Sequence, residues 1–128
     1  MRPALLDTDV LIDYLRGITP AVQYLESMSQ PALISAVTVG ELFVGARDAD
    51  EETKLDRFIN TFDVLPVTHE IARLGGLFRC QYRNTHGTGL ADAFIAATAV
   101  EYEAHLMTFN LRHYPMVDGA NKPYKRPT

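Results

Sequence analysis

The sequence predicts one α/β domain built on a parallel sheet that helices cover on both faces. Short apolar segments alternate with longer segments whose apolar residues recur at helical spacing. The short segments read as strands buried on both faces, which is typical of a parallel sheet. With 128 residues and 47% hydrophobic side chains, the chain can fill a single core. No repeat or linker divides it, so residues 1–128 are expected to form one domain.

In the first half of the chain we expect strands at residues 4–6 and 32–37, and helices at residues 8–16, from 20 onward and at 38–46. Val10 and Tyr14 stand one helical turn apart in the first helix, and Gly17 follows as a natural stop. Pro20 suits the first turn of the next helix because its fixed backbone angle is already helical.

In the second half we expect helices at residues 50–62, from 68 to about 82 and from 90 to about 103, strands at 63–67 and 105–108, and a turn-rich loop at 84–89. Pro66 interrupts the third strand, which predicts that this strand is short or lies at an edge. The alanine-rich helix from residue 90 is expected to be largely buried. Cys80 is expected to be a small core residue of the helix before it.

Three carboxylates, those of Asp7, Glu41 and Asp92, each follow an apolar run where a helix is expected to begin. In a parallel sheet, the carboxyl ends of strands and the amino ends of the following helices lie along one edge. The three acids are therefore expected to converge. Neighbouring carboxylates repel one another and cannot all stay ionised without a cation. The pattern predicts a divalent metal site.

Each acid also has a purely structural explanation. Asp7 suits an N-cap, Thr38-Val-Gly-Glu41 matches a capping box, and Asp92 complements a helix dipole. Capping works equally well with Ser, Thr or Asn, however, whereas an acid occurs at this edge three times. The combination favours a site.

The available ligands indicate a hard cation. The histidines are scattered and form no cluster with zinc spacing; they are His69, His86, His105 and His113. An all-oxygen site suits Mg²⁺ or Mn²⁺. Such an ion can activate a water and neutralise charge on a phosphodiester, which points to nucleic acid as the substrate.

Net charge and cysteine content limit the kinds of nucleic-acid binding and the cellular locations that fit the sequence. A net charge of −4 is the wrong sign for a protein that coats nucleic acid non-specifically. The tail at residues 122–126 is basic, and it could contact RNA or a partner subunit or be a frayed end. A single cysteine, the lack of a signal-like amino terminus and the lack of an apolar run of ~20 residues predict a cytoplasmic protein without membrane contact.

Four motifs in order resemble those of the PIN-domain ribonucleases, most closely the VapC-type toxins of toxin-antitoxin pairs. They are Leu-Leu-Asp7-Thr-Asp9-Val-Leu-Ile, Ser35-Ala-Val-Thr-Val-Gly-Glu41-Leu, Leu90-Ala-Asp92-Ala-Phe-Ile-Ala-Ala-Thr-Ala and Thr108-Phe-Asn110-Leu-Arg-His113-Tyr-Pro. Any one of them is a weak signal, but four in order at fitting distances are specific, and together they cover nearly the whole chain.

The resemblance implies a three-layer α/β/α fold with a parallel sheet of four to five strands. It implies an endoribonuclease that depends on Mg²⁺, with Mn²⁺ as a substitute, and cleaves RNA with a metal-activated water. A homodimer and a cognate VapB-type antitoxin that plugs the acidic cleft are also implied. By position, the metal-site acids would be Asp7, Glu41 and Asp92.

The remaining motif positions have less definite roles. The resemblance makes Thr8 and Asn110 supporting polar residues, and Asp9 would either join the site or start the helix. His113 stands where the family often has a fourth acid, so it either contacts phosphate when protonated or packs under Tyr114. One metal held by three acids remains workable, and a second is in doubt.

Three other functions fit part of the sequence. A catalytically weak PIN domain that binds RNA or a protein partner without cleavage stays open, with His113 as its support. The opening motif also resembles haloacid-dehalogenase-type phosphatases, but none of the lysines follows a predicted strand as that chemistry requires. A signalling receiver domain would need an aspartate after the third strand, where Thr68 and His69 stand.

Overall fold

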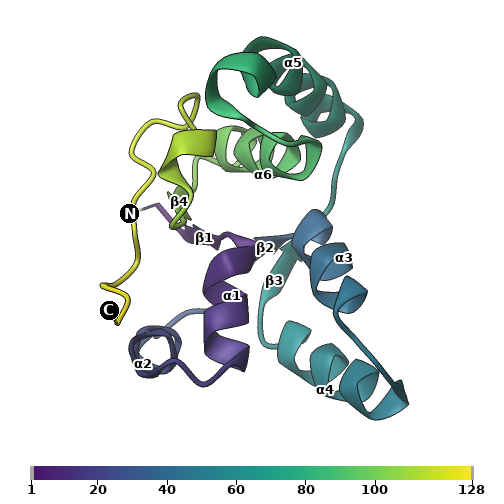
Figure 1. Cartoon of the computed structure of the whole chain (residues 1–128), viewed down its shortest axis with the longest axis vertical. Coiled ribbons are helices and arrows are strands. Elements are labelled where there is room, and N and C mark those ends of the chain that lie inside the picture. Colours follow the sequence, from purple (N-terminus) through teal and green to yellow (C-terminus); the bar gives the residue numbers. More distant parts are fainter. Residues whose placement is uncertain (1, 128) are drawn as a thin grey trace.

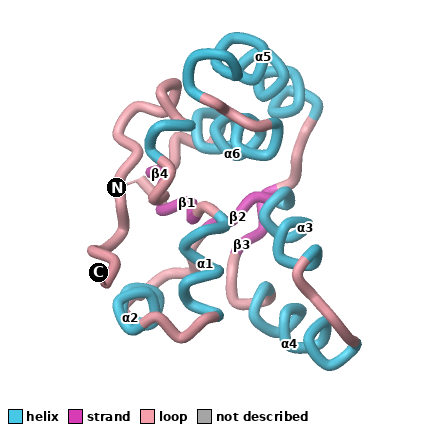
Figure 2. Tube along the Cα trace, in the orientation of Figure 1, coloured by secondary structure: helices cyan, strands magenta, loops and turns pink. Residues whose placement is uncertain are grey.

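The computed structural model describes residues 2–127. Within them, four parallel strands form one sheet in the order β3-β2-β1-β4. The strands are β1 (Ala4–Leu6), β2 (Leu33–Ser35), β3 (Asp63–Leu65) and β4 (His105–Met107). These short strands cross the middle of the molecule and are joined by much longer helical segments (Figure 2). The predicted α/β fold with a parallel sheet is confirmed.

Helices cover both faces of this sheet. They are α1 (Thr8–Leu15), α2 (Thr19–Glu26), α3 (Ala36–Val44), α4 (Ala49–Ile59), α5 (His69–His86) and α6 (Leu90–Glu101), followed by the short 3₁₀ helix η1 (Leu111–His113). The pair α5 and α6 lies on one side of the strands, and α1, α2 and α4 lie on the other (Figure 1). Helix α3 contacts α1, α4 and α6. The arrangement is the three-layer α/β/α fold.

The core divides between the two faces of β1. Leu5 packs with Ile95 and Leu106 on the α6 side, while Leu6 packs with Leu11 and Ile34 on the α1 side. Successive side chains of a strand point to opposite faces, so an uninterrupted apolar run buries both. The sheet is consequently fixed from both sides, and its carboxyl edge is a rigid base for the residues that follow each strand.

Two glycines determine how α5 is placed. A Cβ atom at Gly75 would lie 2.4 Å from the Phe94 ring, so this glycine permits the close approach of α5 to α6. Gly87 adopts a left-handed conformation (φ 65°) just after the last residue of the helix. Helix α5 thus runs to His86. The prediction of a loop at residues 84–89 is therefore wrong for residues 84–86, which are helical.

The second strand and third helix meet earlier than expected. The strand predicted at residues 32–37 ends at Ser35, and α3 begins at Ala36, not at Thr38. Ser35 is the N-cap, because its hydroxyl accepts a hydrogen bond from the Val37 N–H at 3.0 Å. The predicted capping box between Thr38 and Glu41 is therefore wrong, and Glu41 lies in the middle of the helix.

Other expectations have mixed outcomes. The third strand is short and lies at an edge, as Pro66 predicted, and α6 is largely buried. Cys80 is exposed, so its predicted core role is wrong. The tail is not frayed up to residue 127, since Arg126 is paired with Asp13. Among the described residues, no helix has both the length and the apolar character needed to cross a membrane.

Candidate functional site

Asp7 is the centre of a hydrogen-bond network at the carboxyl edge of the sheet. It follows β1 directly and caps α1 by accepting the Thr8 N–H on Oδ1 at 2.8 Å. Its Oδ2 accepts the Thr108 hydroxyl at 2.7 Å and the Tyr114 hydroxyl at 3.0 Å. The residue is only 4% exposed. Three donors therefore fix both oxygens of a carboxylate that solvent hardly reaches.

Thr8 and Tyr114 connect Asp7 to the other predicted acids. Thr8 donates its N–H to Asp7, while its hydroxyl donates to Glu41 Oε1 at 2.6 Å and lies 3.0 Å from the Thr38 hydroxyl. The Tyr114 hydroxyl, which contacts Asp7, lies 3.3 Å from Asp92 Oδ1. Asp7 is thus one residue away from Glu41 through Thr8, and it shares the Tyr114 hydroxyl with Asp92.

Asp92 is held from two further directions. Its Oδ2 accepts the Gly89 N–H at 3.0 Å, which secures the first turn of α6. The same oxygen lies 3.3 Å from His113 Nδ1. His113 therefore contacts an acid directly, a contact that neither of its two sequence-based interpretations includes.

Asp9 lies beside Asp7 and is incompletely paired. Its Oδ2 accepts the Phe109 N–H at 2.9 Å, whereas its buried Oδ1 has no hydrogen-bond partner. Burial raises the pKa of Asp9, and the Phe109 N–H and the Arg126 charge oppose that rise. A buried carboxylate oxygen without a donor is costly unless positive charge or water reaches it.

Burial, and next the negative charge of Asp9, raise the pKa of Asp7 to about 7, despite the three hydrogen bonds that stabilise its charged form. The pKa of Tyr114 also rises, because the phenol is buried and faces the charges of Asp7 and Asp92. The tyrosine therefore stays a hydrogen-bond donor. The cluster has more negative charge than its protein donors neutralise.

The chemical type of the candidate ligands suits a hard cation. All the candidate ligands are carboxylate oxygens, and the unpaired Asp9 Oδ1 marks a place where positive charge is missing. Among residues 2–127, no three acidic, histidine or cysteine side chains stand close enough to surround an ion by themselves. Mg²⁺ commonly takes one or two carboxylates and several waters, so the arrangement fits such an ion without three direct protein ligands.

Asn110 contributes less than predicted. The residue is exposed, and its backbone N–H donates to the Thr108 hydroxyl at 3.0 Å. The side chains that do support the acids, apart from Thr8, are Thr38, Thr108 and Tyr114. Thr108 directly follows β4 at the same sheet edge, a signal that could have identified it. No sequence pattern identified Tyr114 as part of the site, because an isolated aromatic residue in a loop is ordinarily interpreted as part of the hydrophobic core.

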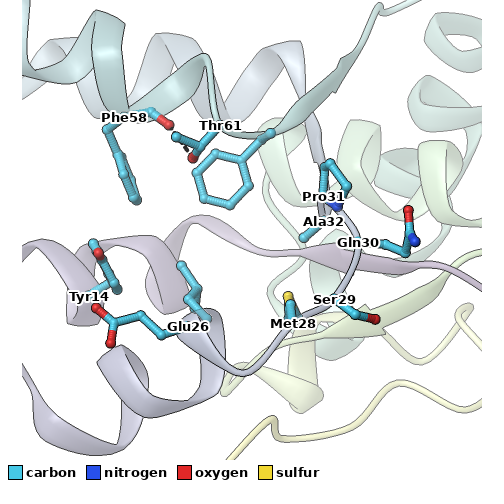
Figure 3. Close-up of a pocket in the computed structure, with 11 residues that line it drawn as sticks. Tyr14, Glu26, Met28, Ser29, Gln30, Pro31, Ala32, Phe58 and Thr61 are labelled. Carbon is cyan, nitrogen blue, oxygen red and sulfur yellow. Dashed lines mark hydrogen bonds between the residues drawn. The ribbon is translucent and has the colours of Figure 1, made fainter.

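Two surface cavities lie apart from Asp7. One of about 430 Å³ lies between α1, the α2–β2 loop and the end of α4, and it is lined by Tyr14, Met28, Phe58 and neighbouring residues (Figure 3). The other, of about 750 Å³, lies between α1, α3 and α4 and has Glu41 on its wall. Glu41 is thus the predicted acid that lines this cavity, and Asp7 and Asp92 are not among its lining residues.

Comparisons with known proteins agree with this geometry. The model of the PIN domain family matches residues 4–117. The chain is 40% identical to ribonuclease VapC10 of Mycobacterium tuberculosis, covering 96% of this chain and 94% of that protein. It is 36% identical to ribonuclease VapC19 of the same organism, covering 94% and 98%.

A solved structure shows the same fold. One chain of a toxin-antitoxin complex from Klebsiella pneumoniae superposes with a TM-score of 0.81 at 31% identity, covering 95% of this chain and 98% of that one. The chain belongs to the PIN-domain family, within the group of the VapC ribonucleases.

Proposed function

We propose that the protein is a Mg²⁺- or Mn²⁺-dependent endoribonuclease that acts as the toxin of a toxin-antitoxin pair. The observation that carries this proposal is the buried Asp7 carboxylate, whose partner residues Thr8 and Tyr114 also contact Glu41 and Asp92. Relatives that cover almost the whole chain are named ribonucleases. Acidic side chains gathered around a buried carboxylate are what a divalent cation stabilises.

In this proposal Asp7, Glu41 and Asp92 hold the ion directly or through its waters, and Asp9 adds charge next to it. When bound, the ion supplies charge neutralisation at the phosphodiester and activation of a water. Thr108 and Tyr114 fix the orientation of the Asp7 carboxylate, and Thr8 does the same for Glu41. These hydroxyls act as the outer partners that keep metal ligands in place.

The partner and assembly are proposed on the same basis. A related structure is a toxin-antitoxin complex, which supports a VapB-type antitoxin as the partner here. A basic side chain of that antitoxin would enter the acid cluster and neutralise it, because Arg and Lys pair strongly with carboxylates. A homodimer is proposed from family resemblance. A structure of the complex with the acid cluster open and empty would contradict the inhibitory contact.

Cleavage of end-labelled cellular RNA by antitoxin-free protein tests the function. Reactions with Mg²⁺, with Mn²⁺ and with chelator would run beside Asp92→Asn, which removes a ligand charge and nearly keeps its shape. Asp56→Asn, on the exposed side of α4, is a matched control. We expect cleavage that needs metal, leaves a 5′-phosphate, disappears in Asp92→Asn and persists in Asp56→Asn.

A PIN domain that binds without cleaving is the second candidate. The observation that favours it is His113, which contacts Asp92 where a further acid would add charge for a second ion. Absence of cleavage by folded protein, together with no metal-induced rise in Tm, would support this candidate.

A further inference from the structure

The last described residues, 121–127, form a strap that connects α1 to the segment after β4. In Figure 1 this yellow segment runs past the amino terminus toward α1 and α2. We propose that the strap, anchored on Asp13, positions residues Thr108 and Phe109 and thereby orients the Asp7 and Asp9 carboxylates. The catalytic consequence rests on the proposed ribonuclease function, whereas the positioning itself does not.

Asp13 is the anchor of the strap. It lies in α1, with a side chain only 10% exposed, and its Oδ2 accepts the Tyr124 hydroxyl at 2.8 Å. Arg126 completes the pairing with Nε at 2.9 Å from Oδ2 and a terminal nitrogen at 3.3 Å from Oδ1. A buried carboxylate with a two-point guanidinium contact is a directional connection, which a random tail contact would not supply.

The same two strap residues hold Phe109. The Arg126 guanidinium lies 3.9 Å from the centre of the Phe109 ring, within the range of a cation–π contact. The centre of the Tyr124 ring lies 5.0 Å from the centre of the Phe109 ring, and the two rings meet edge-on. The Tyr124 ring centre also lies 5.8 Å from that of Tyr24 in α2, with the two rings tilted. Phe109 is therefore enclosed between the strap and the sheet edge.

The strap also holds the backbone at the end of β4. Thr108 donates its N–H to the Asn121 carbonyl at 2.9 Å, and Asn121 donates its own N–H to the Leu106 carbonyl at 3.0 Å. Because β4 is an edge strand of only three residues, these bonds occupy backbone groups that would otherwise be open.

This segment touches the acids directly. The Thr108 hydroxyl donates to Asp7, and the Phe109 N–H donates to Asp9. Asp13, Tyr124 and Arg126 make no hydrogen bond to Asp7 or Asp9, so they position both acids through Thr108 and Phe109. They are positioning residues. The charge of Arg126 additionally opposes the rise in the pKa of Asp9.

Amide hydrogen exchange of metal-free protein, followed by NMR, tests the positioning without RNA or metal. We expect Arg126→Ala to speed exchange at the Phe109 amide about tenfold and Tyr124→Phe to speed it several-fold, with α5 amides unchanged. Lys125→Ala, the exposed neighbour in the strap, is the control and should change nothing. Unchanged exchange at Phe109 in both variants would overturn the proposal.

Metal binding and kinetics then test the consequence. Mn²⁺ titrations followed by electron paramagnetic resonance should show several-fold weaker binding in Tyr124→Phe, which loosens the strap and keeps the Arg126 charge. The kcat of Arg126→Ala for RNA cleavage should fall while KM stays unchanged, and Arg126→Lys should restore part of it. A raised KM with unchanged Phe109 exchange would make Arg126 an RNA contact and overturn the strap. Faster exchange without any RNA cleavage would preserve the strap and reject the ribonuclease function.

Discussion

Asp7 and Glu41 belong to one cluster but lie in opposite environments. Asp7 is 4% exposed, caps a helix and accepts three hydrogen bonds, from Thr8, Thr108 and Tyr114. Glu41 is exposed in the middle of α3 and is held by the Thr8 hydroxyl alone. One acid is fixed by the fold, and the other can change its rotamer.

The difference teaches which part of the site is preorganised. A buried carboxylate with fixed oxygens keeps its geometry when a ligand arrives, whereas an exposed one pays side-chain entropy to adopt it. Burial also makes the charged form of the Asp7 carboxylate unfavourable and raises its pKa to about 7. Replacing Asp7 should therefore have a large effect on both RNA cleavage and cation binding. Replacing Glu41 should have a smaller effect on both.

The largest expected effect is on cleavage rate. Asp7→Asn should lower single-turnover RNA cleavage by at least about 1,000-fold, because charge stabilisation by a metal centre is worth several kcal/mol. Glu41→Gln should lower it only by about 10- to 100-fold, since waters can replace an exposed ligand. Rates at saturating Mn²⁺, with Tm as a check on folding, make the measurement. Equal losses in the two variants would contradict the comparison.

The second effect is a pH dependence of stability. The pKa of Asp7 in the folded protein is about 7, above its ordinary value near 4, and the pKa of Asp9 is also raised. Folding thus favours the protonated forms, so this stability is present below about pH 4 and is lost as pH rises through about 7. The loss for Asp7 is at most about 4 kcal/mol.

Urea unfolding of metal-free protein between pH 4 and 8 would show this loss. Saturating Mn²⁺ at pH 8 should restore stability, and Asp7→Asn should flatten the dependence. The electrostatic account would be contradicted if the free energy of unfolding of the wild type rose between pH 4 and 8 and matched that of Asp7→Asn throughout.

The third effect isolates the hydroxyl shared by Asp7 and Asp92. Tyr114→Phe keeps the buried ring and removes the donor to Asp7 at 3.0 Å. We expect Mn²⁺ affinity to fall about 10- to 100-fold, as when other outer partners of metal ligands are removed. Tyr102→Phe, on an exposed residue that ends α6, is the matched control and should bind like wild type. Calorimetric titration measures both.

The smallest effect concerns the exposed side of the cluster. Thr8→Val removes the hydrogen bond from the Thr8 hydroxyl to Glu41 and nearly keeps the side-chain volume. Stability should fall by about 1 kcal/mol, because the buried Thr38 hydroxyl loses a partner. Mn²⁺ affinity should weaken by less than about tenfold, since waters can replace an exposed ligand. A larger loss of affinity than in Tyr114→Phe would show that Glu41, and not Asp7, is the fixed ligand.

The sequence predicted the sheet well because its signals are local. Apolar runs mark the strands, and an acid directly after a strand marks the carboxyl edge, as for Asp7. The sequence places Glu41 near a helix start because Thr38-Val-Gly-Glu41 matches a capping box. Only the structure shows that Ser35 caps the helix and that the Thr38 hydroxyl contacts Thr8.

The rest of the site depends on contacts between distant parts of the chain. Tyr114 reaches Asp7 across 107 positions and Arg126 reaches Asp13 across 113, and neither spacing has a local pattern. Asn84 to His86 read as a turn by composition, but they continue α5 until Gly87 adopts its left-handed conformation. Such contacts follow from packing, which single-residue propensities do not describe.

Anomalous scattering from crystals of antitoxin-free protein soaked in Mn²⁺ tests the central claim most directly. The account predicts a strong peak roughly 2 Å from an Asp7 carboxylate oxygen, with Glu41 or Asp92 reaching it directly or through water. The peak should be absent in Asp7→Asn crystals. A peak bound elsewhere, or none at Asp7 at millimolar Mn²⁺, would contradict a metal centre organised around the buried aspartate.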